Sequence, residues 1–85
     1  MRLNAYAIHD TAAKAFQRPF FIGQDGEALR AFQDLANDNT HPVGQHPEHY
    51  GIYRIGHYDD QTAKFVDEEN ELLAMAKSLI DTENQ

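Results

Sequence analysis

The sequence predicts an α+β domain in which two helices cover one face of a small four-stranded antiparallel sheet. Three observations support this class: segments rich in tyrosine, phenylalanine and isoleucine, segments with apolar residues at helical spacing, and turn residues between them. In chain order they give β-β-α-β-β-α, for which an antiparallel sheet covered on one face is the simplest packing. The 85 residues (1–85) make a single domain with an acidic helical tail at about 67–85.

The first half of the chain supplies two strands and a helix. Residues 2–8 form the first expected strand and residues 16–22 the second. Pro19 lies inside the second strand and has no amide donor, which favours an edge position or a bulge. Apolar residues at helical spacing predict a helix from Asp25 to Asn37. Asp25 is placed to cap the free amides at the start of this helix.

The second half begins with a loop and a hairpin. Two prolines and a glycine exclude regular structure from residues 38–49. Residues 50–58 form the strongest strand, and a turn at 59–62 leads to a short fourth strand at 63–66. Pairing outward from this turn places Tyr58 opposite Ala63, Gly56 opposite Phe65 and Ile55 opposite Val66. Phe65 would then cover the strand glycine Gly56.

The C-terminal segment shows a helical pattern. Its apolar residues predict a second helix from about Asn70 to Asp81, and residues 82–85 are expected to fray. The residues that carry the pattern are Leu72, Leu73, Ala76, Leu79 and Ile80.

The charge balance argues against strong nucleic-acid binding. The chain carries seven Lys and Arg against fourteen Asp and Glu, a formal net charge of −7, whereas affinity for phosphate comes mainly from cations that release counterions. The acids are partly segregated, because residues 1–58 hold five Lys and Arg against six Asp and Glu. The charge distribution is therefore compatible with a cationic surface formed by residues 1–58.

Several function classes find no support in the sequence. There is no cysteine, hence no disulfide framework and no thiolate nucleophile or metal ligand. No signal peptide and no apolar run long enough for a membrane span is present, so we expect a soluble protein of the cytoplasm. Catalytic triad, GxSxG and phosphate-loop patterns are also missing. We therefore expect no enzyme activity and no cofactor.

A histidine-rich loop is the one metal candidate. His41, His46 and His49 lie close together beside Glu48, and histidine with carboxylate can hold zinc. The spacing is not that of a helical zinc motif, so the preferred interpretation is that the imidazoles hydrogen-bond to nearby backbone. No metal site is predicted.

The face of the sheet opposite the helices is the main candidate site. Strand alternation puts Tyr53, Ile55 and His57 on one face and Tyr50, Ile52, Arg54, Gly56 and Tyr58 on the other. Aromatic residues interleaved with arginine on an open sheet stack single-stranded bases in several small domains. The alternatives are a homodimer interface or a face covered by residues 38–49. The candidate nucleic-acid-binding residues are Arg18, Tyr50, Arg54, Tyr58, Lys64 and Phe65, with Arg2 as a further cation.

Four motifs follow one another along the chain: Arg18-Pro19-Phe20-Phe21, the segment Gly26 to Phe32 followed by Asn37-Asp38, His46-Pro47-Glu48-His49-Tyr50, and Ile55-Gly56-His57-Tyr58-Asp59. Their order and spacing resemble those of a known family. The chain resembles the small nonstructural protein of microviruses, the single-stranded-DNA phages, in their gokushovirus branch. The resemblance covers roughly residues 3–66, His49 stands where the family usually has aspartate, and nothing is carried over to the acidic tail.

The resemblance implies a phage accessory protein in the host cytoplasm. Such proteins are described as binding single-stranded DNA in genome replication or packaging. The alternative expectation is a protein-interaction module that forms a homodimer and engages a phage or host replication protein, which the acidic net charge favours.

Overall fold

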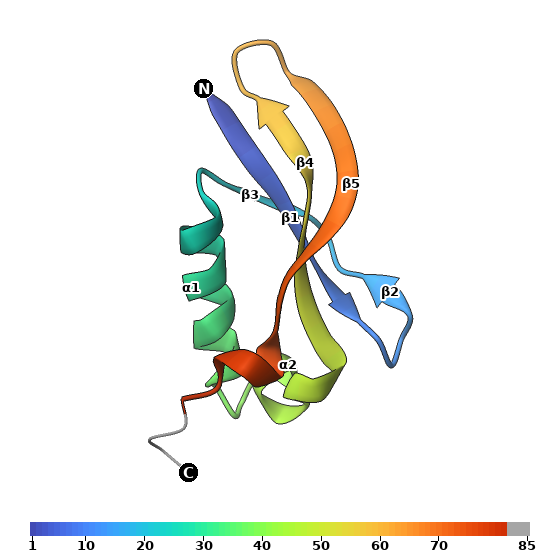
Figure 1. The fold of residues 1–85 in the computed structure, drawn as a ribbon, viewed down its shortest axis with the longest axis vertical. Coiled ribbons are helices and arrows are strands. Elements are labelled where there is room, and N and C mark those ends of the chain that lie inside the picture. Colours follow the sequence, from blue (N-terminus) through green and yellow to red (C-terminus); the bar gives the residue numbers. More distant parts are fainter. Residues whose placement is uncertain (82–85) are drawn as a thin grey trace.

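The fold combines a curled antiparallel sheet with helices packed on one of its faces (Figure 1). The computed structural model describes residues 1–81. The predicted α+β class is therefore confirmed. The elements are β1 (Arg2–Asp10), β2 (Ala15–Phe16), β3 (Phe20–Ile22), α1 (Asp25–Ala36), α2 (Pro42–Gln45), the 3-10 helix η1 (Pro47–His49), β4 (Tyr50–Asp59), β5 (Lys64–Met75) and the 3-10 helix η2 (Ala76–Leu79).

The first strand lies in the middle of the sheet. β4 pairs along one edge of β1, and β5 pairs on the outer side of β4. β2 and β3 pair one after the other with β1. The predicted second strand, residues 16–22, is thus divided at Pro19. The missing amide of Pro19 falls in the gap between the two pieces, which is where a sheet edge tolerates proline.

The hydrophobic core lies between the sheet and α1. Ala28, Phe32 and Ala36 recur at helical spacing and are buried against the sheet. Tyr6 of β1 and Ile52 of β4 meet them and are both 0% exposed. The apolar stripe predicted for the first helix is therefore the surface of α1 that packs against the sheet.

Asp25 joins the helix to the sheet and does not cap the helix. Gln24 occupies the N-cap position and makes no side-chain capping hydrogen bond. The Asp25 carboxylate accepts a hydrogen bond of 2.6 Å from the Tyr6 hydroxyl and pairs with the Arg54 guanidinium. The capping role predicted for Asp25 is wrong, because these sheet partners engage both of its oxygens.

The predicted loop at residues 38–49 contains two short helical turns. Pro42 begins α2 and Pro47 begins η1, and a proline at the first helical position loses no intrahelical hydrogen bond. Gly44 packs so closely that an added Cβ would lie 1.9 Å from the Asp38 carbonyl oxygen. The prolines therefore start helical turns here, and the expectation that they exclude regular structure is wrong.

The second helix predicted at residues 70–81 is wrong over most of its length. β5 continues to Met75, and only the 3-10 helix η2 follows it. The acidic tail is likewise a strand from its start at Asp67 to Met75. β4 is buried over Tyr50–Ile52, so the backbone N–H and C=O groups on its outer edge need hydrogen-bonding partners. The end of β5 supplies them, since Gly51 pairs with Met75 and Ile52 with Ala74. The fraying expected at residues 82–85 lies outside the described residues.

The hairpin register differs by two residues from the prediction. Tyr58 pairs with Phe65 and Gly56 with Asp67, because Ala63 extends the turn with a φ of 60°. The Phe65 ring nevertheless covers Gly56 diagonally, since its Cε1 lies 3.2 Å from the position of an added Cβ. The aromatic cover of Gly56 is confirmed, although the pairing that predicted it is wrong.

Candidate nucleic-acid interface on the open face of the sheet

The sheet has one face that no helix of residues 1–81 covers (Figure 1). Directly paired residues of neighbouring strands point to the same side of a sheet, so the register defines the members of this open face. Along β1, each residue of this face has partners on the neighbouring strands. Leu3 pairs with Tyr58, which pairs with Phe65; Ala5 pairs with Phe21 and Gly56; Ala7 pairs with Tyr53, which pairs with Leu72; and His9 pairs with Phe16 and Gly51.

One aromatic cluster lies at the hairpin end of the open face. The Phe21 ring centroid is 5.4 Å from that of Tyr58 and 6.4 Å from that of Phe65. These distances are typical of aromatic contact. The cluster joins the edge strand β3 to β5 across the curled sheet and covers Ala5, which is 0% exposed.

A second aromatic cluster lies at the other end. The Phe16 ring centroid is 4.5 Å from that of His9 and 5.3 Å from that of Tyr53. The small side chain of Ala7 lies opposite Tyr53 in the sheet. The open face is thus bounded by two groups of three rings with small residues between them.

The rings remain accessible to solvent. Phe16, Phe21 and Phe65 are 45%, 43% and 47% exposed, and Leu72 on the same face is 47% exposed. Scattered apolar residues are normal on a surface, whereas several on one face mark an interaction site. The open face is the strongest candidate for binding in the part of the chain that the structure describes.

A bulge at Ile55 decides which side chains of β4 reach this face. Tyr6 pairs with Arg54 and Ala5 with Gly56, so Ile55 is an extra residue relative to β1. Such a bulge shifts the alternation of the strand by one residue. Tyr53 therefore shares a face with Tyr58, although simple alternation assigned them to opposite faces.

Comparison with known proteins identifies the family. A family model described as Phage ORF5 protein matches residues 3–79. The chain belongs to the Phage ORF5 protein family. No curated protein and no solved structure matches the chain. The match supports a phage protein and extends beyond residues 3–66, the part that carried the resemblance.

Two predicted site residues of this phage protein lie on the covered side of the sheet. Tyr50 is only 8% exposed and belongs to the core cluster. The guanidinium of Arg54 binds Asp25 of α1, and its Nη2 lies 2.6 Å from Glu71 Oε2. Placing Tyr50 and Arg54 on the open face was wrong, because the bulge at Ile55 separates them from Tyr58.

Of the other predicted residues, Tyr58, Phe65 and Arg18 lie on or beside the open face, and Lys64 does not. Tyr58 and Phe65 belong to the first aromatic cluster. Arg18 is exposed in the gap between β2 and β3, and Lys64 is exposed at the start of β5. Neither forms an ion pair within residues 1–81, whereas the Arg2 guanidinium lies 3.9 Å from Glu68. Lys64 pairs with Asp59, so its side chain shares the other face with that of Val66. Arg18 lies between Gln17 and Pro19 and is the predicted cation beside the open face.

The sequence analysis missed Phe16, Phe21 and Tyr53. A usable signal existed, because adjacent Phe20 and Phe21 in one strand must point to opposite faces. Phe20 contacts the core residue Tyr6, with ring centroids 5.8 Å apart, so Phe21 had to face outward.

In the histidine loop of this phage protein, the predicted imidazole-to-backbone hydrogen bond is found for His41. The Nδ1 atom of His41 accepts a 3.1 Å hydrogen bond from the Val43 amide and caps α2. His49 lies 3.4 Å from Glu48 and its carbonyl oxygen accepts from Thr11. Among residues 1–81, no three His, Asp or Glu side chains are grouped to hold a metal ion. In the same residues no helix has the length and apolar character to span a membrane.

Proposed function

We propose that this phage protein is a non-enzymatic accessory protein that binds single-stranded DNA through the open face. The observation that carries the proposal is the pair of exposed aromatic clusters on the uncovered side of the sheet. The resemblance to microvirus nonstructural proteins supports a role in replication or packaging of a single-stranded genome in the host cytoplasm.

Stacking is the main source of affinity in this proposal. Each base stacked on an aromatic ring contributes about 1–3 kcal/mol, regardless of sequence. Phe16 and Phe65 are the most exposed rings of the two clusters, so a strand crossing from one cluster to the other meets both. Arg18 lies beside this path, between the lining residues Gln17 and Pro19, and supplies phosphate contacts.

The net charge of −7 limits the affinity. Asp67, Glu68 and Glu69 lie on β5 along one side of the open face, so phosphates are expected on the opposite side, near Arg18. Because few cations contact phosphates, the binding constant should fall only slightly as the salt concentration rises. The slope of this dependence follows the number of phosphates neutralised.

A fluorescence anisotropy titration tests the proposal. A labelled oligonucleotide of about twelve thymidines spans a site of ordinary size for a small domain. We expect binding at low salt that weakens as salt is raised. Phe16→Ala and Phe65→Ala should each weaken it about 5- to 150-fold, as expected for one lost stacking contact.

Matched variants separate the open face from the rest of the surface. Arg18→Glu should weaken binding more than Arg30→Glu, which makes the same charge change at an exposed position on α1. Val66→Ala is the control for Phe65→Ala, because Val66 is 45% exposed but pairs with His57 on the other face. The proposal fails if no oligonucleotide binds at low salt.

A homodimer is the second candidate function. The observation that favours it is the exposure of Phe16, Phe21, Phe65 and Leu72 on one face of an acidic protein. In this case the open faces of two copies cover each other, and the acidic strand β5 is left to engage a phage or host replication protein. Sedimentation distinguishes the two: a dimer that Phe65→Ala dissociates, with no affinity for DNA, supports this candidate.

A further inference from the structure

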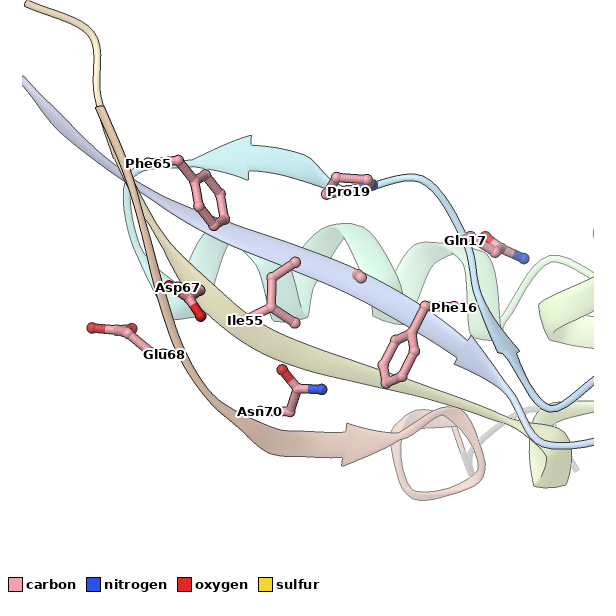
Figure 2. Close-up of a pocket in the computed structure, with 9 residues that line it drawn as sticks. Phe16, Gln17, Pro19, Ile55, Phe65, Asp67, Glu68 and Asn70 are labelled. Atoms are coloured by element: carbon pink, nitrogen blue, oxygen red, sulfur yellow. The ribbon is translucent and has the colours of Figure 1, made fainter. Parts of the chain in front are cut away.

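The open face contains a hollow between its two aromatic clusters. The cavity volume is about 360 Å³, which exceeds the volume of a nucleobase. Figure 2 shows Phe16 and Pro19 on one side, β5 on the other side and Ile55 between them. The lining residues are Ala7, Phe16, Gln17, Pro19, Ile55, Phe65, Asp67, Glu68 and Asn70.

An irregularity in the β4–β5 pairing lies directly at the hollow. Arg54 pairs with Glu71 and Gly56 pairs with Asp67. Ile55 alone therefore stands opposite the three residues 68–70 of β5. Bulges redirect side chains and are common beside binding sites. Here the bulge adds the Ile55 side chain to the floor and brings polar residues of β5 to the rim.

The lining has two kinds of surface. Phe16 and Phe65 contribute aromatic rings, and Ala7 and Ile55 contribute an apolar floor. Polar groups come from Gln17 on one side and from β5 on the other. No lining residue that the structure describes carries a positive charge. This combination suits a flat ring with hydrogen-bonding edges and disfavours a phosphate.

The polar groups of the rim differ in availability. The Oε2 atom of Glu68 lies 3.3 Å from His57 Nδ1 and 3.9 Å from Arg2, and its carboxylate points outward in Figure 2. In contrast, no side-chain hydrogen bond or ion pair within residues 1–81 engages Asp67 or Asn70. Asp67 offers two acceptor oxygens, and the Asn70 amide offers a donor and an acceptor.

This set of groups matches guanine best among the DNA bases. Guanine presents two neighbouring N–H donors beside a carbonyl oxygen. The two oxygens of Asp67 can accept from the donors while the Asn70 amide donates to the carbonyl. Thymine presents a single donor between two carbonyl oxygens, which a carboxylate repels. Adenine and cytosine each offer one amino donor, so their expected affinity for the hollow lies between those of guanine and thymine.

We propose that the hollow holds one unpaired base of a bound single strand and prefers guanine over thymine, with Asp67 as the specificity-determining residue. This inference rests on the proposed binding of single-stranded DNA. It adds a preference to a surface whose stacking contacts are themselves independent of sequence.

The test compares four oligonucleotides that differ at one position. Labelled strands of about twelve thymidines carry dT, dC, dA or dG at the centre, and anisotropy at low salt gives the Kd of each. A good base-specific contact discriminates by about 5- to 150-fold, so we expect the dG strand to bind at least about fivefold tighter than the dT strand. A dG preference below twofold, with all strands bound, would overturn the inference and leave the proposed function standing.

Variants assign the preference to the hollow. Asp67→Asn removes the charge with little change of shape and should abolish the dG preference without weakening the dT strand. Glu69→Gln is the matched control, because it makes the same charge change on the same strand outside the lining. A dG preference that survives Asp67→Asn unchanged would overturn the assignment to this site.

Two further outcomes concern the class of ligand. If no strand binds at low salt, the proposed function fails and the inference fails with it. A short arginine-containing peptide provides the competing test, because guanidinium groups also stack on aromatic rings and pair with carboxylates. Binding of this peptide that Asp67→Asn abolishes, with no DNA bound, would assign the hollow to a cationic protein partner.

Discussion

The two faces of the sheet use similar side chains for opposite purposes. Tyr6 on the covered face is 0% exposed, and its hydroxyl is bound to Asp25. Phe65 on the open face is 47% exposed and packs on the ring of Phe21 and on Gly56. The aromatic residues of the covered face therefore hold the fold together, whereas those of the open face remain available for binding. Stability and binding should respond to different substitutions.

The largest expected effect is on the covered face. Phe32 is 1% exposed at the centre of the α1 stripe, so Phe32→Ala should lower the free energy of unfolding by about 3–5 kcal/mol. Urea unfolding followed by circular dichroism measures this. A cost below about 1 kcal/mol, the range of a surface truncation, would show that α1 does not seal the core.

The next effect depends on pH. Burial, followed by the hydrogen bond to Asp25, raises the pKa of Tyr6 from its ordinary value of 10.0 to about 12. Below pH 10 the phenol is protonated in both states, and between these values only the unfolded state ionises. The free energy of unfolding should therefore fall with rising pH over this window, by about 1.4 kcal/mol per pH unit and up to about 3 kcal/mol.

Tyr6→Phe checks the origin of this alkaline loss. Urea titrations from pH 8 to pH 11 should give a shallower decline in the variant, and Tyr53→Phe on the open face controls for the substitution itself. Burial also raises the pKa of Tyr50, so a residual slope of the same sign should persist. An unchanged slope in Tyr6→Phe would contradict the burial of this hydroxyl.

A smaller effect is expected for the ion pairs of Arg54. Arg54→Met keeps the bulk of the side chain but leaves Asp25 and Glu71 without their cation. Because these carboxylates are partly exposed to water, the expected loss of stability is about 1–2 kcal/mol. Arg18→Met is the control and should stay within about 0.5 kcal/mol. Equal stability of both variants would mean that Arg54 does not join α1 to the sheet.

The smallest effect is expected on the open face. Phe65→Ala removes a ring that is already half in water, so the cost in stability should be below about 1 kcal/mol. The same variant is expected to lose most of its DNA affinity. A cost comparable to that of Phe32→Ala would erase the contrast between the two faces and make the open face part of the core.

Local patterns in the sequence predicted the elements whose partners are close in the chain. The stripe of Ala28 and Phe32 predicted α1, and the tyrosine- and isoleucine-rich run predicted β4. The predicted hairpin also gave the contact of Phe65 with Gly56, although the observed strand register differs from the predicted one by two residues. In each case the interaction that forms the element is encoded within a few residues of it.

Long-range pairing accounts for the errors. Leu72 and Leu73 fit a helical stripe, yet they lie in β5, where Leu72 pairs with Tyr53 and Leu73 packs against the core. The edge of β4 supplies hydrogen bonds that no local pattern reveals. The bulge at Ile55 is similar, because it depends on the alignment of β4 with both β1 and β5. It moved Arg54 from the candidate site to the covered face.

The central position of β1 has a consequence for biosynthesis. The N-terminal strand forms its longest ladder with β4, pairing Ile8 with Ile52 and Arg2 with Asp59, and such distant contacts form late because long loops must close first. While the chain leaves the ribosome, β1 finds only the short strands β2 and β3. We therefore expect nascent chains that stop before residue 50 to stay unfolded, and folding to await the arrival of the β4–β5 hairpin.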